Sequence, residues 1–241
     1  MNDWFTASTP LILGHRGASA DAPENTLAAF ALAVAQGADG VELDVQLAAD
    51  GWPVVCHDFR VDRVTNGTGL VSQLTVAQLR ELDAGQGEYV PTLDEVFELL
   101  GPGVLVNVEL KNWDWRDKGL ETAVADRIQS HNRERQVLVS SFNPFALRRA
   151  RRHLTRSTSL ALIRERGWLQ YSYLLAQGQA DHPHHSLVNE RYMAWARRRG
   201  YRVHVWTVDD PAEARRLAAL GVHGLITNKP ELIRASLERE A

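Results

Sequence analysis

Two carboxylates, Glu42 and Asp44, lie two positions apart in the apolar stretch Gly40-Val-Glu-Leu-Asp-Val-Gln-Leu47. Successive side chains of an extended strand point to opposite faces, so Glu42 and Asp44 share one face. Two negative charges held this close are unfavourable unless a cation or a shared proton relieves the repulsion. The pair therefore indicates half of a site for a hard metal ion or, as the alternative, an acid pair.

A third carboxylate, Glu109, stands near the end of the apolar stretch Val104-Leu-Val-Asn-Val-Glu-Leu-Lys111, where it shares one face with Lys111. Charged residues at a strand end are often only a solvated rim. Here, however, carboxylates recur at the same end of two strands. In barrel enzymes this end carries the chemistry, so the recurrence favours a functional site.

Two histidines are candidates for proton transfer in the same site. His15 ends the first apolar stretch and is followed by Arg16, and His57 ends the stretch Pro53–His57. Imidazole exchanges protons near neutral pH, and a guanidinium offers a fixed fork of donors to a phosphate or carboxylate. The residue types thus predict two acid-base groups that enter from different walls, with an anion-binding arginine beside one of them.

Short apolar strands alternate with helical patterns almost from end to end. We expect strands at Leu11–His15, Gly40–Gln46, Val104–Leu110, Gln136–Ser140, Thr158–Ile163, Ala180–His184, Arg202–Trp206 and Gly224–Thr227. We expect helices at Asn25–Gln36, Leu93–Leu100, Gly119–Asn132, Pro144–Leu154, Trp168–Ala176, Glu190–Arg199, Pro211–Leu220 and Glu231–Glu240. Eight strand-helix units in 241 residues favour a (β/α)8 TIM barrel over an open doubly wound sheet.

One segment, residues 51–90, breaks this alternation. It contains a further short strand at Pro53–His57 and a small helix at Thr75–Leu82. A long non-barrel segment after the second strand emerges at the carboxyl-terminal rim, where loops build active sites. We therefore expect a single TIM-barrel domain over residues 1–241, with an inserted subdomain at 51–90 that caps its carboxyl-terminal face.

Composition excludes several classes of protein. A net charge of −3 argues against a general nucleic-acid binder, and the arginine clusters at 148–152 and 197–199 fall in helical patterns that predict solvated faces. Cys56 is the only cysteine, which excludes an internal disulfide and a multi-thiolate metal site. The sequence shows neither a basic leader nor an apolar stretch that could span a bilayer, so we expect a cytoplasmic location without stable membrane association.

Eight short motifs together resemble those of the glycerophosphodiester phosphodiesterase family. They are His15-Arg16-Gly17, Pro23-Glu24-Asn25-Thr26, Glu42-Leu43-Asp44, His57-Asp58, Thr65-Asn-Gly-Thr-Gly69, Pro91-Thr92-Leu93, Glu109-Leu110-Lys111 and Trp206-Thr207-Val208. Each motif alone is weak, but the set follows the family's order and spacing over nearly the whole chain. The resemblance implies a TIM barrel with a small insertion after the second strand, which agrees with the pattern of elements.

The resemblance also implies a metal site. Carried over residue by residue, it makes Glu42, Asp44 and Glu109 the ligands of one divalent cation. Hard oxygen ligands suit Mg²⁺ or Ca²⁺, and the sequence leaves both open. A bound cation would polarise the phosphoryl oxygen of a substrate.

The same resemblance makes His15 and His57 the general base and acid. We favour His57 as the acid, because it comes from the inserted segment, whereas His15 lies on the barrel wall beside Arg16. Arg16 and Lys111 are implied to contact the phosphate, and we expect this role for them rather than that of structural ion-pair partners. Whether water or a hydroxyl of the substrate's own glycerol attacks the phosphorus stays open.

Three further features are less defined. Trp206 is in phase with His204 and should point into the barrel mouth, where it would wall the glycerol or leaving-group pocket or else form part of the core. The family usually shows Thr-Asp where this chain has Thr227-Asn228, a departure that leaves the catalytic set intact and would change the rim. The cluster His182-Pro-His-His185 could be a second metal site, but a locally hydrogen-bonded surface loop is the favoured interpretation.

The function implied is metal-dependent hydrolysis of glycerophosphodiesters, which are small molecules, to glycerol 3-phosphate and an alcohol. One alternative is a phosphodiesterase for lysophospholipids or sphingomyelin-type substrates; such an enzyme would be expected to carry an apolar or basic surface loop, and none is evident. Another is a non-catalytic sensor of phosphate ligands. The two histidines argue against a sensor, because a binding protein needs no acid-base pair.

Overall fold

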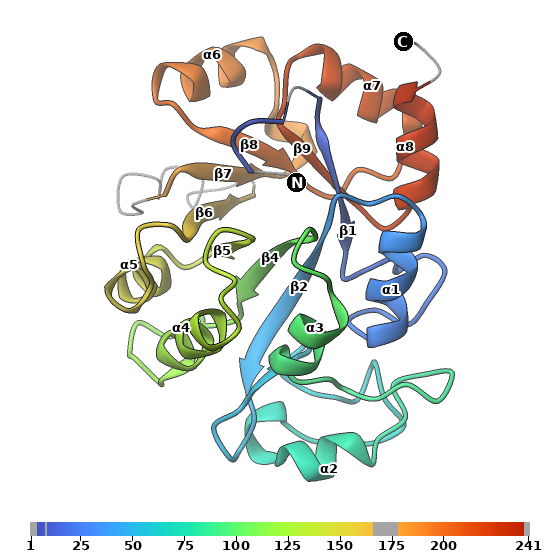
Figure 1. Ribbon diagram of the computed structural model, residues 1–241, viewed down its shortest axis with the longest axis vertical. Coiled ribbons are helices and arrows are strands. Elements are labelled where there is room, and N and C mark those ends of the chain that lie inside the picture. The colour runs from blue at the N-terminus through green and yellow to red at the C-terminus, as the bar shows by residue number, and fades with distance from the viewer. Residues whose placement is uncertain (1–3, 8, 166–177, 239–241) are drawn as a thin grey trace.

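The computed structural model describes residues 4–7, 9–165 and 178–238, and these form a closed barrel of eight parallel strands with helices between them (Figure 1). Its strands are β1 (Leu11–His15), β2 (Gly40–Leu47), β4 (Leu105–Leu110), β5 (Val137–Ser141), β6 (Ser159–Arg164), β7 (Ala180–Pro183), β8 (Arg202–Val205) and β9 (Gly224–Thr227). Pairing of β1 with both β9 and β2 closes the ring. The prediction of a (β/α)8 barrel is confirmed.

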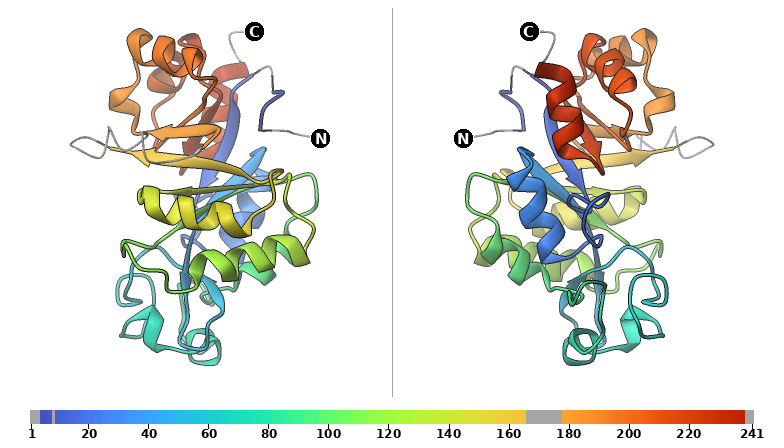
Figure 2. Two further views of the ribbon diagram at one scale, coloured as in Figure 1. Left: turned by 90° about the vertical axis from the view of Figure 1, so that its left-hand side faces the viewer. Right: turned by 90° about the vertical axis from the view of Figure 1, so that its right-hand side faces the viewer.

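Helices cover the outside of the barrel, with α4 and α5 on one side and α1 and α8 on the opposite side (Figure 2). They are α1 (Leu27–Ala35), α3 (Leu93–Leu99), α4 (Leu120–Ser130), α5 (Pro144–His153), α6 (Glu190–Arg198), α7 (Pro211–Ala219) and α8 (Pro230–Glu238). The helix expected at Trp168–Ala176 lies outside the described residues. Within the part of the chain that the structure describes, no helix is both long enough and apolar enough to cross a membrane.

Side-chain caps explain why several of these helices begin where they do. Thr26 and Asn143 accept hydrogen bonds from amides in the first turns of α1 and α5. Thr92 and Glu95 form a reciprocal capping box at the start of α3. Each cap satisfies amides that the first helical turn leaves without partners, so the loop before the helix is fixed as well.

Strand register brings the acidic residues together. In the parallel pair of β2 and β4, Asp44 lies opposite Glu109 and Glu42 lies opposite Asn107. The alternate residues of β2, among them Leu43, face outward and pack with the helices in the largest apolar cluster. Because β2 cannot shift by one residue without burying its carboxylates in this apolar layer, its hydrophobic face fixes where the acids point.

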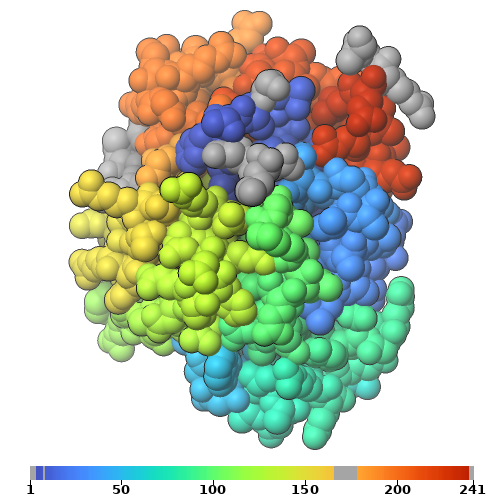
Figure 3. Space-filling view, viewed as in Figure 1, coloured from blue at the N-terminus to red at the C-terminus, as the bar shows by residue number. Residues whose placement is uncertain are grey.

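Residues 51–90 contain β3 (Pro53–Val55), the 3-10 helix η1 (Val71–Gln73) and α2 (Val76–Arg80). β3 runs antiparallel to β2 and does not join the barrel. The segment has a small apolar cluster of its own, made of Ala48, Val54, Cys56, Val61, Val71, Leu79 and Val90. It extends beyond the carboxyl end of β2 and forms the lower end of the molecule in Figures 1 and 3.

The strand of this segment is shorter than predicted, because it ends at Val55 rather than at His57. His57 consequently lies in a turn, and Gln46 of β2 fixes that turn. The Gln46 side-chain amide donates to the carbonyl oxygens of Cys56 and Asp58, each at 2.7 Å. The turn is thereby tied to the barrel by buried hydrogen bonds, which limits how far the His57 ring can move.

Gly40 provides a test of the close packing of β2 on β4. A Cβ atom at this position would meet the carbonyl oxygen of Leu105 at 2.3 Å. We expect Gly40→Ala to lower the free energy of unfolding by about 1–3 kcal/mol, because backbone must move to relieve the overlap. Gly101→Ala is the matched control, since a Cβ there would have open space, and it should change stability by less than about 0.5 kcal/mol.

Urea denaturation would measure the free energy of unfolding of both variants, provided that its dependence on urea concentration has the same slope in each. Equal stability of the Gly40 and Gly101 variants would contradict this account of the β2–β4 contact.

Candidate active site

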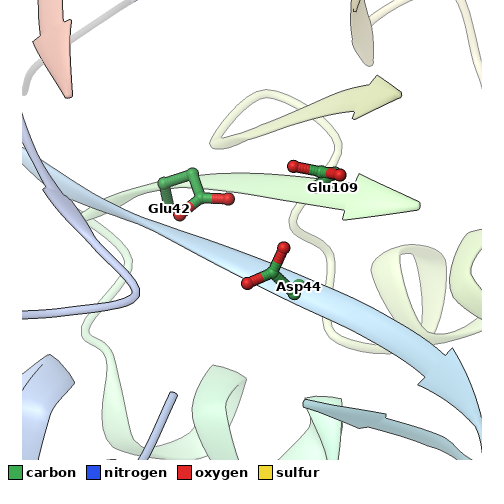
Figure 4. Close-up of side chains that lie close together, drawn as sticks. All are labelled: Glu42, Asp44 and Glu109. Atoms are coloured by element: carbon green, nitrogen blue, oxygen red, sulfur yellow. The ribbon is translucent and has the colours of Figure 1, made fainter. Parts of the chain in front are cut away.

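Three carboxylates meet at the carboxyl end of the barrel. Glu42 and Asp44 project from β2 and Glu109 from β4, and their carboxylate groups lie close together above the two strands (Figure 4). One oxygen from each lies within 4.8 Å of the others. Among the described residues, this is the only group of three or more potential metal ligands gathered within reach of a single ion.

The cluster is buried, and burial sets its electrostatics. Burial, and then the charge of Asp44, raise the pKa of Glu42 to about 8 and likewise the pKa of Glu109 to about 8. Burial also acts to raise the pKa of Asp44, but the positive charges of Lys111 and Arg16 outweigh it and hold that pKa below its usual value. Two of the three acids thus favour protons when no cation is bound. A divalent cation could replace those protons, so the donor set fits a hard metal ion.

Both basic residues of the site pair with these acids. The Nζ of Lys111 lies 2.9 Å from Glu109 Oε1 and 3.5 Å from Asp44 Oδ1. The Nε of Arg16 lies 3.3 Å from Asp44 Oδ2, and its Nη1 lies 2.9 Å from Glu24 Oε1. Arg16 and Lys111 are thus paired with acids in this arrangement, while their expected contact with a phosphate stays a prediction. The pairing places two positive side chains directly beside the carboxylates.

His15 is oriented by an amide. Its Nδ1 lies 2.7 Å from Asn228 Oδ1, while Asn228 Nδ2 donates to Asp209 Oδ2 at 2.6 Å, which fixes the orientation of the amide group. Nδ1 must therefore carry the proton of the neutral ring. Nε2 is left as an acceptor on the side of Glu42, 4.0 Å from its carboxylate. Burial and the charge of Arg16 lower the pKa of His15, which favours this neutral form.

His57 is oriented by a carboxylate instead. Its Nδ1 lies 2.6 Å from Asp58 Oδ1, and Asp58 in turn accepts from Arg63 Nε at 2.6 Å. Arg63 also donates two hydrogen bonds to Glu24, at 2.9 and 2.7 Å. Hydrogen bonding to Arg63 lowers the pKa of Asp58 to about 2, so this partner stays charged. Burial lowers the pKa of His57, whereas the Asp58 hydrogen bond opposes that shift.

One small pocket, here called the inner pocket, brings these groups together. Its volume is about 80 Å³, and its lining includes both histidines, Arg16, Glu42 and Glu109. Its apolar lining consists of Phe142, Ile163, Trp206 and Ile226. Most of the predicted residues thus line one pocket, Trp206 among them, and Asp44 and Lys111 lie beside its carboxylates.

Two further polar residues line the inner pocket: Asn107, which the sequence analysis did not select, and His182, which it considered only as part of the histidine cluster 182–185. Asn107 and His182 both line the pocket and are 1% exposed. His182 Nε2 hydrogen-bonds to Nδ1 of the buried His204 at 2.9 Å. Within the described residues, Asn107 Oδ1 and His182 Nδ1 have no hydrogen-bond partner. In the sequence, Asn107 is in phase with Glu109 on the same strand, and His182 is in phase with Trp206 on the adjacent one. These phases were the signal that could have found both residues.

The histidine cluster after β7 divides into two environments. His182 is buried, so its assignment to a surface loop is wrong. His184 and His185 do form local contacts: His184 Nδ1 lies 2.8 Å from Ser186 Oγ, and His185 Nδ1 lies 3.2 Å from Glu213 Oε1. In the described parts of the chain, these histidines do not gather as a second metal site.

Comparisons with known proteins show which proteins this chain resembles. The model of the "Glycerophosphoryl diester phosphodiesterase family" matches residues 15–232. A glycerophosphodiester phosphodiesterase of Caldanaerobacter subterraneus is 38% identical over 233 residues, which cover 92% of this chain and 96% of that protein. A solved phosphodiesterase of Oleispira antarctica, in complex with the product sn-glycerol-3-phosphate, is 32% identical with a TM-score of 0.84 and covers 95% of this chain and 97% of its own.

A second solved structure, a glycerophosphodiester phosphodiesterase of Agrobacterium tumefaciens, is 29% identical with a TM-score of 0.78. The match covers 94% of this chain and 99% of that one. The similarity therefore extends over whole chains and not over one motif.

The raised acid pKa values predict how pH and metal act on stability. The pKa values of Glu42 and Glu109 are about 8 in the folded protein, against 4.5 for a free side chain. Between these values the folded protein holds more protons than the unfolded chain, so stability should fall as pH rises from about 5 to 8. A divalent cation should raise the melting temperature more at pH 8 than at pH 5, since it binds the deprotonated acids.

Thermal melts with chelator and with millimolar Ca²⁺ or Mg²⁺ would measure both effects. Glu109→Gln is the comparison variant and should weaken both the pH slope and the shift with metal. A melting temperature at pH 8 that does not respond to either cation would contradict the metal site.

Proposed function

The chain belongs to the glycerophosphoryl diester phosphodiesterase family, a family of hydrolases, and from that premise we propose its mechanism. It hydrolyses a glycerophosphodiester to glycerol 3-phosphate and an alcohol, with one divalent cation and two histidines. The observation that carries the proposal is the inner pocket, where two differently oriented histidines and two carboxylates of the three-carboxylate cluster surround room for one small molecule. Support also comes from the Oleispira antarctica relative, whose structure contains sn-glycerol-3-phosphate.

Glu42, Asp44 and Glu109 would hold the cation, and their all-oxygen donor set suits Ca²⁺ or Mg²⁺. When bound, the cation polarises a phosphoryl oxygen and offsets its negative charge. Arg16 and Lys111 then have less negative charge to balance among the acids. Their donors become available to the remaining phosphate oxygens.

The partners of the two histidines favour a division of labour. His15 has a neutral amide partner and presents an unprotonated Nε2, so it accepts the proton of the attacking hydroxyl, whether that belongs to water or to the glycerol. His57 has the charged carboxylate of Asp58, which stabilises an imidazolium, so it protonates the departing alkoxide. The new oxygen–phosphorus bond forms as the bond to the alcohol breaks. Attack by water gives glycerol 3-phosphate at once, whereas attack by the glycerol hydroxyl gives a cyclic phosphate that water then opens to glycerol 3-phosphate.

We also propose that residues 51–90 are an inserted subdomain that helps cover the site. The segment supplies His57, and its Arg63 bridges Asp58 and Glu24, which lies in the loop after β1. The bridge is ionic and its Arg63 is half-exposed, so it adds to the apolar contact that Val55 of β3 makes with the main core.

The direct test is turnover by purified protein on glycerophosphocholine, with Mg²⁺, with Ca²⁺ and with chelator, followed by detection of glycerol 3-phosphate. We expect cation-dependent release of glycerol 3-phosphate. Turnover of lysophosphatidylcholine alone would favour the lipid phosphodiesterase. Binding of glycerol 3-phosphate without turnover of any diester would favour the sensor.

Lys111→Met separates a phosphate contact from a structural ion pair. The change keeps the length of the side chain and removes its charge, so we expect turnover of glycerophosphocholine to fall roughly 100-fold or more. The melting temperature should fall far less in proportion. Arg80→Met, which removes a half-exposed ion pair with Glu95, is the control and should leave turnover unchanged. Matched losses of stability and activity in the Lys111 variant would support the structural role instead.

The leaving group distinguishes the two histidines. His15→Ala and His57→Ala should each lose about 10²–10⁴-fold in turnover of glycerophosphocholine while metal affinity stays nearly intact. A p-nitrophenolate departs without a proton, whereas the choline alkoxide does not. The variant that lacks the acid, His57→Ala, should therefore be rescued selectively on the p-nitrophenyl ester.

Selective rescue of His15→Ala would reverse the assignment. Activity of both variants within a few-fold of the parent protein on glycerophosphocholine would remove the acid-base mechanism.

A further inference from the structure

A second depression, here called the outer hollow, adjoins the inner pocket. The two meet at an ion pair: Glu109 lines the inner pocket, Lys111 lines the outer hollow, and the two side chains lie 2.9 Å apart. The outer hollow has a volume of about 230 Å³, compared with about 80 Å³ inside. A phosphodiester bound at the carboxylates would therefore have room for a substituent on each side, with the larger space outside.

Two exposed aromatic side chains line the outer hollow. Trp113, from the loop after β4, is 56% exposed, and Phe59, from the inserted segment, is 47% exposed. Trp113 stacks on Phe142 with ring centroids 5.6 Å apart, and Phe142 meets Trp206 edge-on at 5.6 Å. An aromatic surface thus continues from the wall of the inner pocket to the outer hollow.

Buried polar contacts hold the loop that carries Trp113. Asn143 Nδ2 donates to the carbonyl oxygens of Asn112 and Asp114, at 2.8 and 2.9 Å. Arg149 Nη1 donates to the carbonyl oxygen of Trp115 at 3.0 Å. The backbone on both sides of the indole is therefore fixed by groups other than the indole. A large apolar side chain held open to solvent beside a catalytic pocket points to a ligand.

We propose that the outer hollow binds the alcohol half of the substrate and selects an alcohol that carries a quaternary ammonium group, of which choline is the simplest. This inference rests on the proposed function and adds the substrate class. Faces of Trp and Phe attract a cation that has given up its water, with Trp the stronger. The ammonium of a choline ester follows its phosphate by two carbons, and the hollow is lined by Lys111 as well as by Trp113 and Phe59.

The polar groups of the hollow explain why a quaternary ammonium suits it better than a primary one. A primary ammonium requires three acceptors, whereas a quaternary one requires none. Most polar side chains here already have partners: Gln46 bonds to carbonyl oxygens of the insertion, Asn112 to Glu121, and Asp114 to Lys118. The aromatic faces of Trp113 and Phe59 therefore remain available to a ligand.

The positive charge of Lys111 does not exclude a cation from the hollow. Lys111 is paired with Glu109 at 2.9 Å and with Asp44 at 3.5 Å. In the complex its remaining partner would be the phosphate, which lies between the lysine and the alcohol. The net charge of the groups around the ammonium is therefore near zero. Contact with the aromatic faces then decides which alcohol is preferred.

The test compares kcat/KM for three esters of glycerol phosphate in one assay. They are the choline ester, the ethanolamine ester and the uncharged 3,3-dimethylbutyl ester, which has the shape of choline with carbon in place of nitrogen. We expect the parent protein to favour choline by about three- to tenfold over each of the others. Trp113→Leu and Phe59→Leu should lower kcat/KM for the choline ester several-fold more than for the uncharged ester, and so remove most of this preference.

Two further variants control for folding and for general exposure of aromatic residues. Trp113→Phe retains an aromatic face and should retain most of the preference. Trp115→Leu changes a neighbour that is 72% exposed and does not line the outer hollow, so it should have no effect.

Equal kcat/KM of the parent protein for the choline and uncharged esters would overturn the inference while leaving the proposed function intact. An equal loss of kcat/KM on all three esters in Trp113→Leu would also overturn it, since Trp113 would then support the pocket without recognising the cation. Failure of the parent protein to hydrolyse any of the three would overturn the proposed function, and the inference with it.

Discussion

The repulsion among three buried carboxylates is the constraint that organises this molecule. Strand register places Asp44 opposite Glu109, and the apolar outer face of β2 prevents a shift that would separate them. Burial then raises the pKa values of two of the acids to about 8. Protons, Arg16 and Lys111 share the task of balancing this charge. The same three carboxylates could hold a divalent cation in place of the protons, because a cation relieves the repulsion among them.

The two histidines gain different properties from their different hydrogen-bond partners. His15 bonds to the amide of Asn228, which Asp209 orients, whereas His57 bonds to the carboxylate of Asp58. An amide partner orients the imidazole ring without adding charge, whereas a carboxylate partner orients the ring and places a negative charge beside it. Two rings of the same chemistry are thus suited to opposite proton transfers. The departure at Asn228, which from the sequence concerned only the rim, reaches His15 directly.

Periodicity predicted the barrel, because strands buried on both faces and amphipathic helices each leave a pattern in the sequence. It also predicted that Glu42 and Glu109 lie near each other, since parallel strands end at the same rim of the barrel. It could not supply contacts between distant segments. The bond from Asn228 to His15, the burial of His182 and the outward orientation of Trp113 depend on strands and loops far apart in the chain. No local pattern encodes such contacts.

Calorimetric titration of Ca²⁺ or Mg²⁺ into chelator-treated protein at pH 7, in two buffers with different ionisation enthalpies, tests whether protons occupy the carboxylate cluster until a cation replaces them. The account predicts one cation per chain and an observed heat that differs between the buffers by the equivalent of about one to two released protons. Glu109→Gln should reduce both the affinity and the number of protons. Binding of one cation with the same heat in both buffers would contradict the account.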